Sequence, residues 1–202
     1  MVTYSQISQD IFTFNFFKKQ KGYFLDLGCG NGSFSPCGNN TLLLEQNGWT
    51  GISIDINKEY VNQFKKNRSS IAICTDLTQN SLDKILKENN APQIIDYLSF
   101  DVDEATENAL QTLPLDEYKF KLITFEHNEY IKNSIYSKIK KMAKEKFESF
   151  GYEILINNVI LEGHGAVEDW YINTEETKDF DKKYLTNINH KELLKQYSYV
   201  KS

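Results

Sequence analysis

The sequence is short of the features that define several protein classes. It has three cysteines, Cys29, Cys37 and Cys74, without the CxxC spacing of a zinc site, and an odd number cannot form a complete disulfide framework. It has only three prolines, no Pro/Gly/Ser-rich linker and no internal repeat, which excludes a low-complexity or solenoid organisation. These absences favour a single domain with reduced thiols.

A broad basic surface and a long hydrophobic run are also missing. The 202 residues carry 23 Lys and Arg against 28 Asp and Glu, a formal net charge of −5. A protein that grips nucleic-acid phosphates usually needs the opposite sign, so nucleic acid is a disfavoured partner, although a local basic patch is compatible with this composition. No stretch has the length of a membrane span and Met1–Asp10 is unlike a secretory signal, so we expect a cytoplasmic protein without membrane association.

The chain does contain a regular alternation of short apolar runs and amphipathic segments. Apolar residues make up 40% of it, enough for a core, and the alternation predicts a parallel sheet wrapped by helices. Strands are expected at Tyr23–Leu27, Ile52–Ile56, Ile71–Cys74, Ile94–Phe100, Phe120–Phe125, Tyr152–Asn157 and Val167–Ile172. Helices are expected from Leu42 to about Asn47 and at Lys58–Asn67, Ser81–Glu88, Glu104–Thr112 and Asn133–Phe150.

Seven strands, the last two joined by a loop, match one variant of the doubly wound α/β sheet. The predicted fold class is a Rossmann-like class I methyltransferase fold, with a seven-stranded, mostly parallel sheet, helices on both faces and the last strand antiparallel to its neighbours. We expect residues 1–173, with an N-terminal helical segment, to form this domain and 174–202 to be a C-terminal appendage. Apolar residues of that tail could form a lid or contact a second copy in a homo-oligomer: Leu185, Ile188, Leu193, Leu194 and Tyr197.

A glycine-rich turn follows the first strand, within Phe24–Gly32. Glycine permits tight turns and lets a ligand approach the backbone. The spacing is G-x-G-x-G, and Ser33 stands where the third glycine of a dinucleotide motif would fall, which favours S-adenosylmethionine over NAD. Alone, such a motif also suits a purely structural turn. The residues expected to contact the cofactor here are Asp26, Gly28, Cys29 and Gly30.

Two further acids follow the next two strands. Asp55 ends the second strand, where a carboxylate can accept hydrogen bonds from both ribose hydroxyls, or alternatively cap the helix that begins at Lys58. Asp76 follows the third strand, where it could accept from an adenine amino group or serve as a turn aspartate. Ile56 and Leu77 are the expected apolar plates around the base.

The fourth and fifth strands end in acidic segments at the edge where open α/β sheets bind ligands. We expect Asp101, Glu126 and His127 to lie around a methyl acceptor, with a carboxylate or the histidine as general base. The same carboxylates could hold a divalent ion such as Mg²⁺. A structural histidine, and a helix dipole that favours Asp103 and Glu104, are the alternative interpretations.

From Tyr4 to Asn173 the sequence resembles the FkbM family of methyltransferases. The resemblance implies methyl transfer from S-adenosylmethionine to a hydroxyl, typically of a sugar or glycosylated product. The chain departs from the family at Asp103-Glu104, where the family often has Glu followed by Gly, and at its longer Ser33–Asn39 segment. The supporting segments are Tyr4-Ser5-Gln6, Gln9-Asp10, Phe24–Gly32, Asn40–Glu45, Gly48–Gly51, Leu98–Asp103, Ile123–Asn128 and Glu168–Tyr171.

Other functions stay open at the level of sequence. A weaker likeness to metal-dependent O-methyltransferases would use Asp101 with Glu126 and Asn128, although strand alternation could point some of these away. A nucleic-acid or protein methyltransferase is the enzymatic alternative, and the acidic charge opposes the former. A nucleoside-binding module without turnover is the non-enzymatic alternative, and donor binding without any product would favour it.

Overall fold

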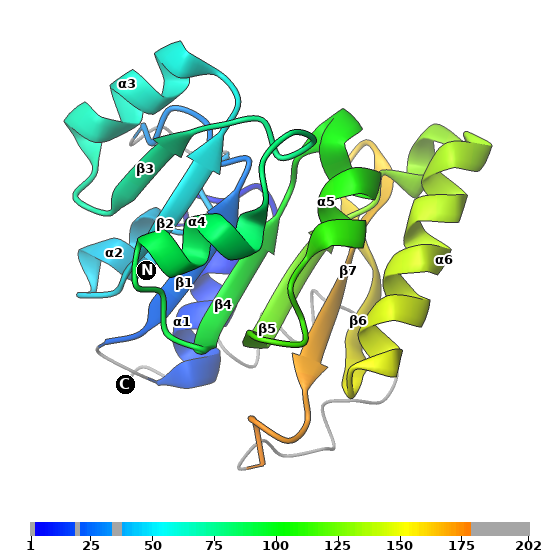
Figure 1. The fold of residues 1–202 in the computed structure, drawn as a ribbon. Helices are drawn as coiled ribbons and strands as arrows, with labels where there is room; N and C mark the ends of the chain where they lie inside the picture. The colour runs from blue at the N-terminus through cyan, green and yellow to red at the C-terminus, as the bar shows by residue number, and fades with distance from the viewer. Residues whose placement is uncertain (1–2, 19–20, 34–37, 179–202) are drawn as a thin grey trace, which may run out of the picture.

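The computed structural model describes residues 3–18, 21–33 and 38–178, which form a seven-stranded sheet flanked by helices (Figure 1). The strand order is β3-β2-β1-β4-β5-β7-β6, and β7 is antiparallel to both of its neighbours while the other pairs are parallel. The predicted fold class is therefore confirmed. The strands are β1 (Tyr23–Leu27), β2 (Thr50–Asp55), β3 (Ile71–Cys74), β4 (Ile94–Phe100), β5 (Lys119–Glu126), β6 (Tyr152–Leu161) and β7 (Gly165–Asn173).

Helices cover both faces of this sheet. Figure 1 shows α4, α5 and α6 in front of the sheet and α1 behind it. The expected helices are present, and β6 continues to Leu161 instead of ending at Asn157. The helices are α1 (Gln9–Phe17), α2 (Leu42–Gln46), α3 (Lys58–Asn67), α4 (Leu82–Glu88), α5 (Thr106–Thr112) and α6 (Ser134–Ser149), with short 3-10 helices η1 (Asp103–Ala105) and η2 (Glu129–Ile131).

The longest helix, α6, forms where its apolar periodicity predicts. Ile139, Ala143 and Phe147 recur at helical spacing and are buried against the sheet. Asn133 caps the start, because its side chain accepts a hydrogen bond of 3.0 Å from the Ile135 amide. A cap of this kind typically contributes about 1 kcal/mol.

Strand alternation divides the interior into two layers. The layer under α4, α5 and α6 contains Leu25, Leu98 and Ile123, and the layer behind the sheet, beneath α1, contains Tyr97 and Leu122. Because side chains alternate with a period of two, every second residue continues the same layer along a strand. Near the carboxyl ends of the strands the positions of the α1 layer become polar: Asp26, Ser99, Asp101, Thr124 and Glu126.

The segment after β7 is described only as far as Lys178. Within it, Thr177 donates a hydrogen bond of 2.6 Å to the carbonyl of Asn173, and Glu175 pairs with Lys119 at 2.8 Å. The apolar tail residues expected to form a lid lie outside the described part of the chain. Among the residues that the structure does describe, no helix is long and apolar enough to cross a bilayer.

Candidate active site

The glycine-rich turn packs directly against the end of β4. The amides of Gly28 and Cys29 both donate to the Ile54 carbonyl, at 2.8 and 3.1 Å, and the Asp101 amide donates to Leu27. Gly28 has φ +82°, and a Cβ built on it would lie 1.6 Å from the Asp101 carbonyl oxygen. No side chain fits there, so Gly28 allows the turn and the β4 terminus to touch.

Gly30, two residues later, faces open space instead. Its φ is +60°, and a Cβ built on it would meet no atom of the described residues within 4 Å. Its amide donates a hydrogen bond of 2.9 Å to Asp55 Oδ2, while Asp55 Oδ1 accepts from the Asn57 amide at 2.7 Å. Each carboxylate oxygen retains a lone pair for a further donor. The turn is therefore a cradle with room for a ligand against its backbone and an acceptor beside it.

Asp26 supports this cradle from inside the protein. It is only 3% exposed, and its Oδ2 accepts a hydrogen bond of 2.7 Å from Thr41, which in turn accepts one from Arg68. Burial raises the pKa of Asp26. Cys29 is likewise buried, and burial raises the pKa of its thiol. The structure thus places these two predicted cofactor residues below the turn rather than on its open side.

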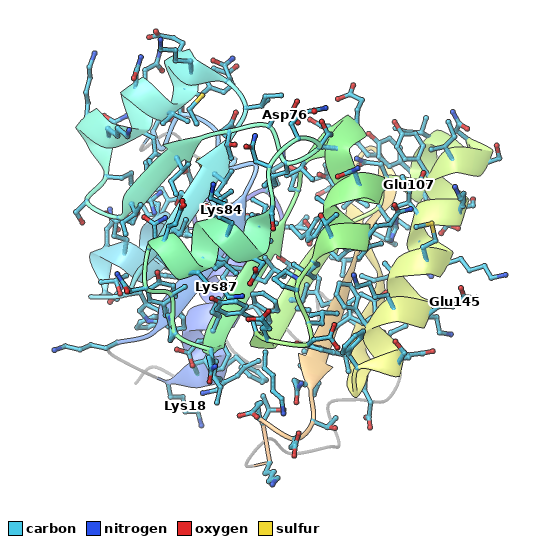
Figure 2. The ribbon with its side chains drawn as sticks, in the orientation of Figure 1. Lys18, Asp76, Lys84, Lys87, Glu107 and Glu145 are labelled. Carbon is cyan, nitrogen blue, oxygen red and sulfur yellow. The ribbon has the colours of Figure 1, made fainter. Side chains whose placement is uncertain are left out.

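The residues expected to surround the adenine are only partly accessible to a ligand. The Ile56 side chain is 67% exposed after β2, whereas Leu77 is 6% exposed and belongs to the core. Asp76 lies at the molecular surface above β3 (Figure 2). Its carboxylate accepts from the amide and hydroxyl of Thr78, at 2.8 and 2.7 Å, and these hydrogen bonds lower its pKa. Ile56 is thus open to a ligand, whereas Leu77 is part of the core.

Three acids gather where β4 and β5 end, and we name Asp101, Asp103 and Glu126 the carboxylate cluster. One oxygen from each lies within 4.8 Å of the others, close enough for a single cation to contact all three. Burial, then the hydrogen bond and charge of Glu126, raise the pKa of Asp101 well above its usual value. Burial also raises the pKa of Glu126. Burial thus disfavours the charged form of both carboxyl groups, which interact directly with each other.

The backbone beside the cluster is unusual. Asp103 has φ 45° and Asn128 has φ 53°, both in the left-handed region that residues with a Cβ rarely adopt. Such conformations cost energy and concentrate at functional sites. Asn128 also donates a side-chain hydrogen bond that favours the ionised form of Glu126. One such turn therefore follows β4 and the other follows β5, and both lie beside the carboxylate cluster.

His127 does not join this cluster. It follows Glu126 directly, so its side chain points to the opposite, α6 side of the sheet, where it is fully buried. Its Nδ1 accepts from the Glu129 amide at 3.1 Å, and its Nε2 faces Asp169 at 3.4 Å. The expectation that His127 shares the acceptor site with Asp101 and Glu126 does not fit this arrangement, because successive strand residues face opposite ways.

Glu168, on β7, is the acid that sequence reasoning missed. It pairs with Glu126 across β5 and β7, and it is 6% exposed. Gln9 and Trp170 donate to its two oxygens, at 2.8 and 2.6 Å. Burial raises its pKa to about 7. Two adjacent acids inside the run Val167–Ile172, Glu168 and Asp169, were the available signal, since acids in a buried strand need buried partners.

The model of the FtsJ-like methyltransferase family matches residues 9–155, which cover both the cradle and the carboxylate cluster. The chain belongs to this family. The prediction of an S-adenosylmethionine-dependent methyltransferase is thereby confirmed, while membership of the FkbM family is not shown. No curated protein matches the sequence of this FtsJ-like methyltransferase.

Solved structures that resemble this FtsJ-like methyltransferase support its fold. A candidate O-methyltransferase from Klebsiella pneumoniae has a TM-score of 0.58 at 10% identity, over 82% of this chain and 79% of that one. A candidate rRNA methylase from Clostridium thermocellum scores 0.53 at 13% identity, over 85% and 97%. Aeropyrum pernix fibrillarin with bound S-adenosyl-L-methionine scores 0.51 at 11% identity, over 81% and 76%. Identities this low describe a shared fold and leave the acceptor open.

Proposed function

We propose that this methyltransferase transfers a methyl group to a hydroxyl of a sugar or glycosylated small molecule. The observation that carries the proposal is the Asp101–Glu126 carboxyl pair at the strand ends, which adjoins the glycine-rich turn through the Gly28–Asp101 contact. A carboxyl group that can accept a proton therefore lies next to the cradle in which the methyl donor would bind. This is what alkylation of a weakly nucleophilic hydroxyl requires.

The donor site extends along the cradle. Gly30 leaves room for the donor against the backbone, Asp55 accepts from ribose hydroxyls, and Ile56 and Asp76 lie beside the adenine. Asp26 and Cys29 hold the turn in shape from below, and Leu77 supports the base from the core. S-adenosylmethionine supplies the electrophilic methyl group when bound there.

Glu126 is the general base in this proposal. Its carboxylate accepts the acceptor's hydroxyl proton while the carbon–oxygen bond forms and the carbon–sulfur bond breaks. In the same proposal Asp101 carries a proton, donates a hydrogen bond to Glu126 and keeps the pair at a single negative charge. Burial keeps the pKa of Glu126 above that of a free carboxyl, which makes it a stronger base.

The class of acceptor is supported by charge and by the resemblance to the FkbM family. Carboxyl groups accept hydrogen bonds from neutral hydroxyls, whereas they repel phosphates. The net charge of −5 points the same way. The FkbM-like segments include Leu98–Asp103 and Ile123–Asn128, which contain both members of the carboxyl pair.

The test is transfer of a labelled methyl group from S-adenosylmethionine to a panel of oligosaccharides, glycolipids and glycosylated small molecules, followed by mass spectrometry. Glu126→Gln should lower turnover by about 10²–10⁴-fold, the usual contribution of a positioned base, and leave donor affinity unchanged. Glu153→Gln, at an exposed position on β6, is the matched control. If Glu126→Gln keeps parental turnover while His127→Ala loses it, the assignment of the base is wrong.

A second candidate is an RNA hydroxyl. It is favoured by the fold shared with a candidate rRNA methylase and with a Methanococcus jannaschii fibrillarin described as a pre-rRNA processing protein. The same labelled-donor assay on total RNA and tRNA distinguishes the two. Methylated ribose in the RNA, with no product in the glycan panel, would replace the sugar proposal.

A further inference from the structure

Gln9 and Glu168 form a buried polar contact that the proposed mechanism leaves unused. They are 159 positions apart in sequence, and the Gln9 Nε2 donates a hydrogen bond of 2.8 Å to Glu168 Oε1. Trp170 Nε1 donates to the other oxygen at 2.6 Å. Both members of the Gln9–Glu168 pair are almost fully buried. Two donors on two separate oxygens hold the carboxyl in one orientation.

This carboxyl lies next to the proposed base. Glu168 and Glu126 are direct partners in the register of β5 and β7, which brings their side chains onto the same face about 5 Å apart at Cβ. Like charges repel at this distance. Since Glu168 cannot turn away from its two donors, the repulsion favours the position of Glu126 that contacts Asp101.

Gln9, the other member of the pair, belongs to the segment Thr3–Asp10, which its own hydrogen bonds hold in shape. Gln9 Oε1 accepts from the Ile7 amide at 3.0 Å. The buried carboxylate of Asp10 accepts from the Tyr4 amide at 2.8 Å and from the Ser5 hydroxyl at 2.7 Å. The segment Thr3–Asp10 is thereby held beside β7, at the edge of the sheet where the carboxylate cluster lies.

We propose that Glu168 is a positioning residue of the methyl-acceptor site: clamped by Gln9 and Trp170, it holds Glu126 against Asp101 and makes the segment Thr3–Asp10 a wall of that site. The inference rests on the proposed function, because it assigns Glu126 as the base. It adds β7 and α1 to a site otherwise built from β1, β2, β4 and β5.

The kinetic test uses two variants of the full chain, Glu168→Gln and Gln9→Leu, with whichever acceptor the panel identifies. Glu168→Gln keeps the shape and removes the charge, whereas Gln9→Leu removes the clamp from another element. Both should lower kcat by about 10- to 100-fold, the scale for a displaced catalytic group, with donor affinity by calorimetry unchanged. Glu153→Gln and Gln93→Leu, at exposed positions outside the proposed site, are the controls and should match the parent.

Parental kcat in both variants would overturn the inference. An equal loss of kcat and donor affinity would also overturn it, because this would indicate general damage to the fold.

A second measurement needs no acceptor. In carbon-13 NMR of the full chain, Glu168→Gln and Gln9→Leu should shift the carboxyl resonances of Asp101 and Glu126, and Glu153→Gln should shift neither. Unmoved resonances would overturn the positioning role. If the parent methylates no hydroxyl in any panel, the proposed function fails. The positioning role of Glu168 is then decided by the carboxyl resonances.

Discussion

The Gly30 amide donates a hydrogen bond of 2.9 Å to the Asp55 carboxylate, and this contact ties the glycine-rich turn to the end of β2. The proposed ribose acid is thus also part of the turn's framework. Its loss affects both the shape of the cradle and the contacts to the donor. We expect Asp55→Ala to weaken donor binding by about 1–3 kcal/mol, the scale for an unpaired polar group.

Calorimetric titration with S-adenosylmethionine measures this loss. Glu59→Ala, an exposed acid on the following helix, is the control and should bind as the parent does. An Asp55→Ala variant with parental affinity would contradict the assignment of the donor site. Tight binding of NADH would contradict the choice of cofactor.

The two glycines of the turn should respond differently to alanine. Gly28→Ala brings a Cβ to 1.6 Å from a backbone oxygen, so we expect a chain that does not fold stably. The Cβ of Gly30→Ala would meet no atom of the described residues, so this variant carries only the left-handed backbone penalty of about 1–2 kcal/mol. It should fold yet bind the donor more weakly, since its methyl group would fill the cradle.

Circular dichroism with thermal melting, followed by calorimetry on the folded variants, checks this pair. Equal stability of the two alanine variants would contradict the structure of the turn. Parental donor affinity in Gly30→Ala would show that the donor binds elsewhere.

Stability should fall as pH rises toward neutral. Burial raises the pKa of Glu168 from 4.5 to about 7, so the folded chain binds this proton more tightly than the unfolded chain does. The contribution is complete below about pH 4.5 and is lost as pH rises through 7, which amounts to about 3 kcal/mol. The raised pKa values of Asp101 and Glu126 act in the same direction.

Urea unfolding at pH 5 and pH 8 measures the effect. Glu168→Gln has no proton to lose and should show a smaller difference between the two free energies of unfolding. A variant with the same pH dependence as the parent would rule out Glu168 as a contributor.

Removal of the C-terminal tail should leave the domain intact. The last strand of the described residues ends at Asn173, and the ion pair of Lys119 with Glu175 is exposed, a type that contributes about 0–1 kcal/mol. A chain ending at Asn173 should unfold cooperatively and bind S-adenosylmethionine with parental affinity. Aggregation of the shortened chain in size-exclusion chromatography would place the tail in the core.

Turnover should be insensitive to chelators. The carboxylate cluster is small enough for one divalent ion, and yet the proposed mechanism uses the Asp101–Glu126 pair as base without one. EDTA treatment, followed by addition of Mg²⁺ or Mn²⁺, measures this on a verified acceptor. Activity that disappears with EDTA and returns with the metal would favour a metal-assisted hydroxyl.

Much of this protein could be predicted from local pattern. Runs with a period of two and helices with a period of 3.6 located the strands and helices, because each element must bury one face. The glycine-rich turn and the acids after consecutive parallel strands predicted the cofactor edge, since such strands end at the same side of the sheet. These features lie within short stretches of the chain.

Which residues share the proposed acceptor site was decided by tertiary structure. Glu126 and His127 are neighbours in sequence, and the pleat of β5 sends them to opposite faces. Glu168 and Gln9 are far from both in sequence, and the antiparallel insertion of β7 between β5 and β6 places Glu168 beside Glu126. Residue types and spacing can mark an acid as unusual, whereas its partners depend on strand order and register, which only long-range packing determines.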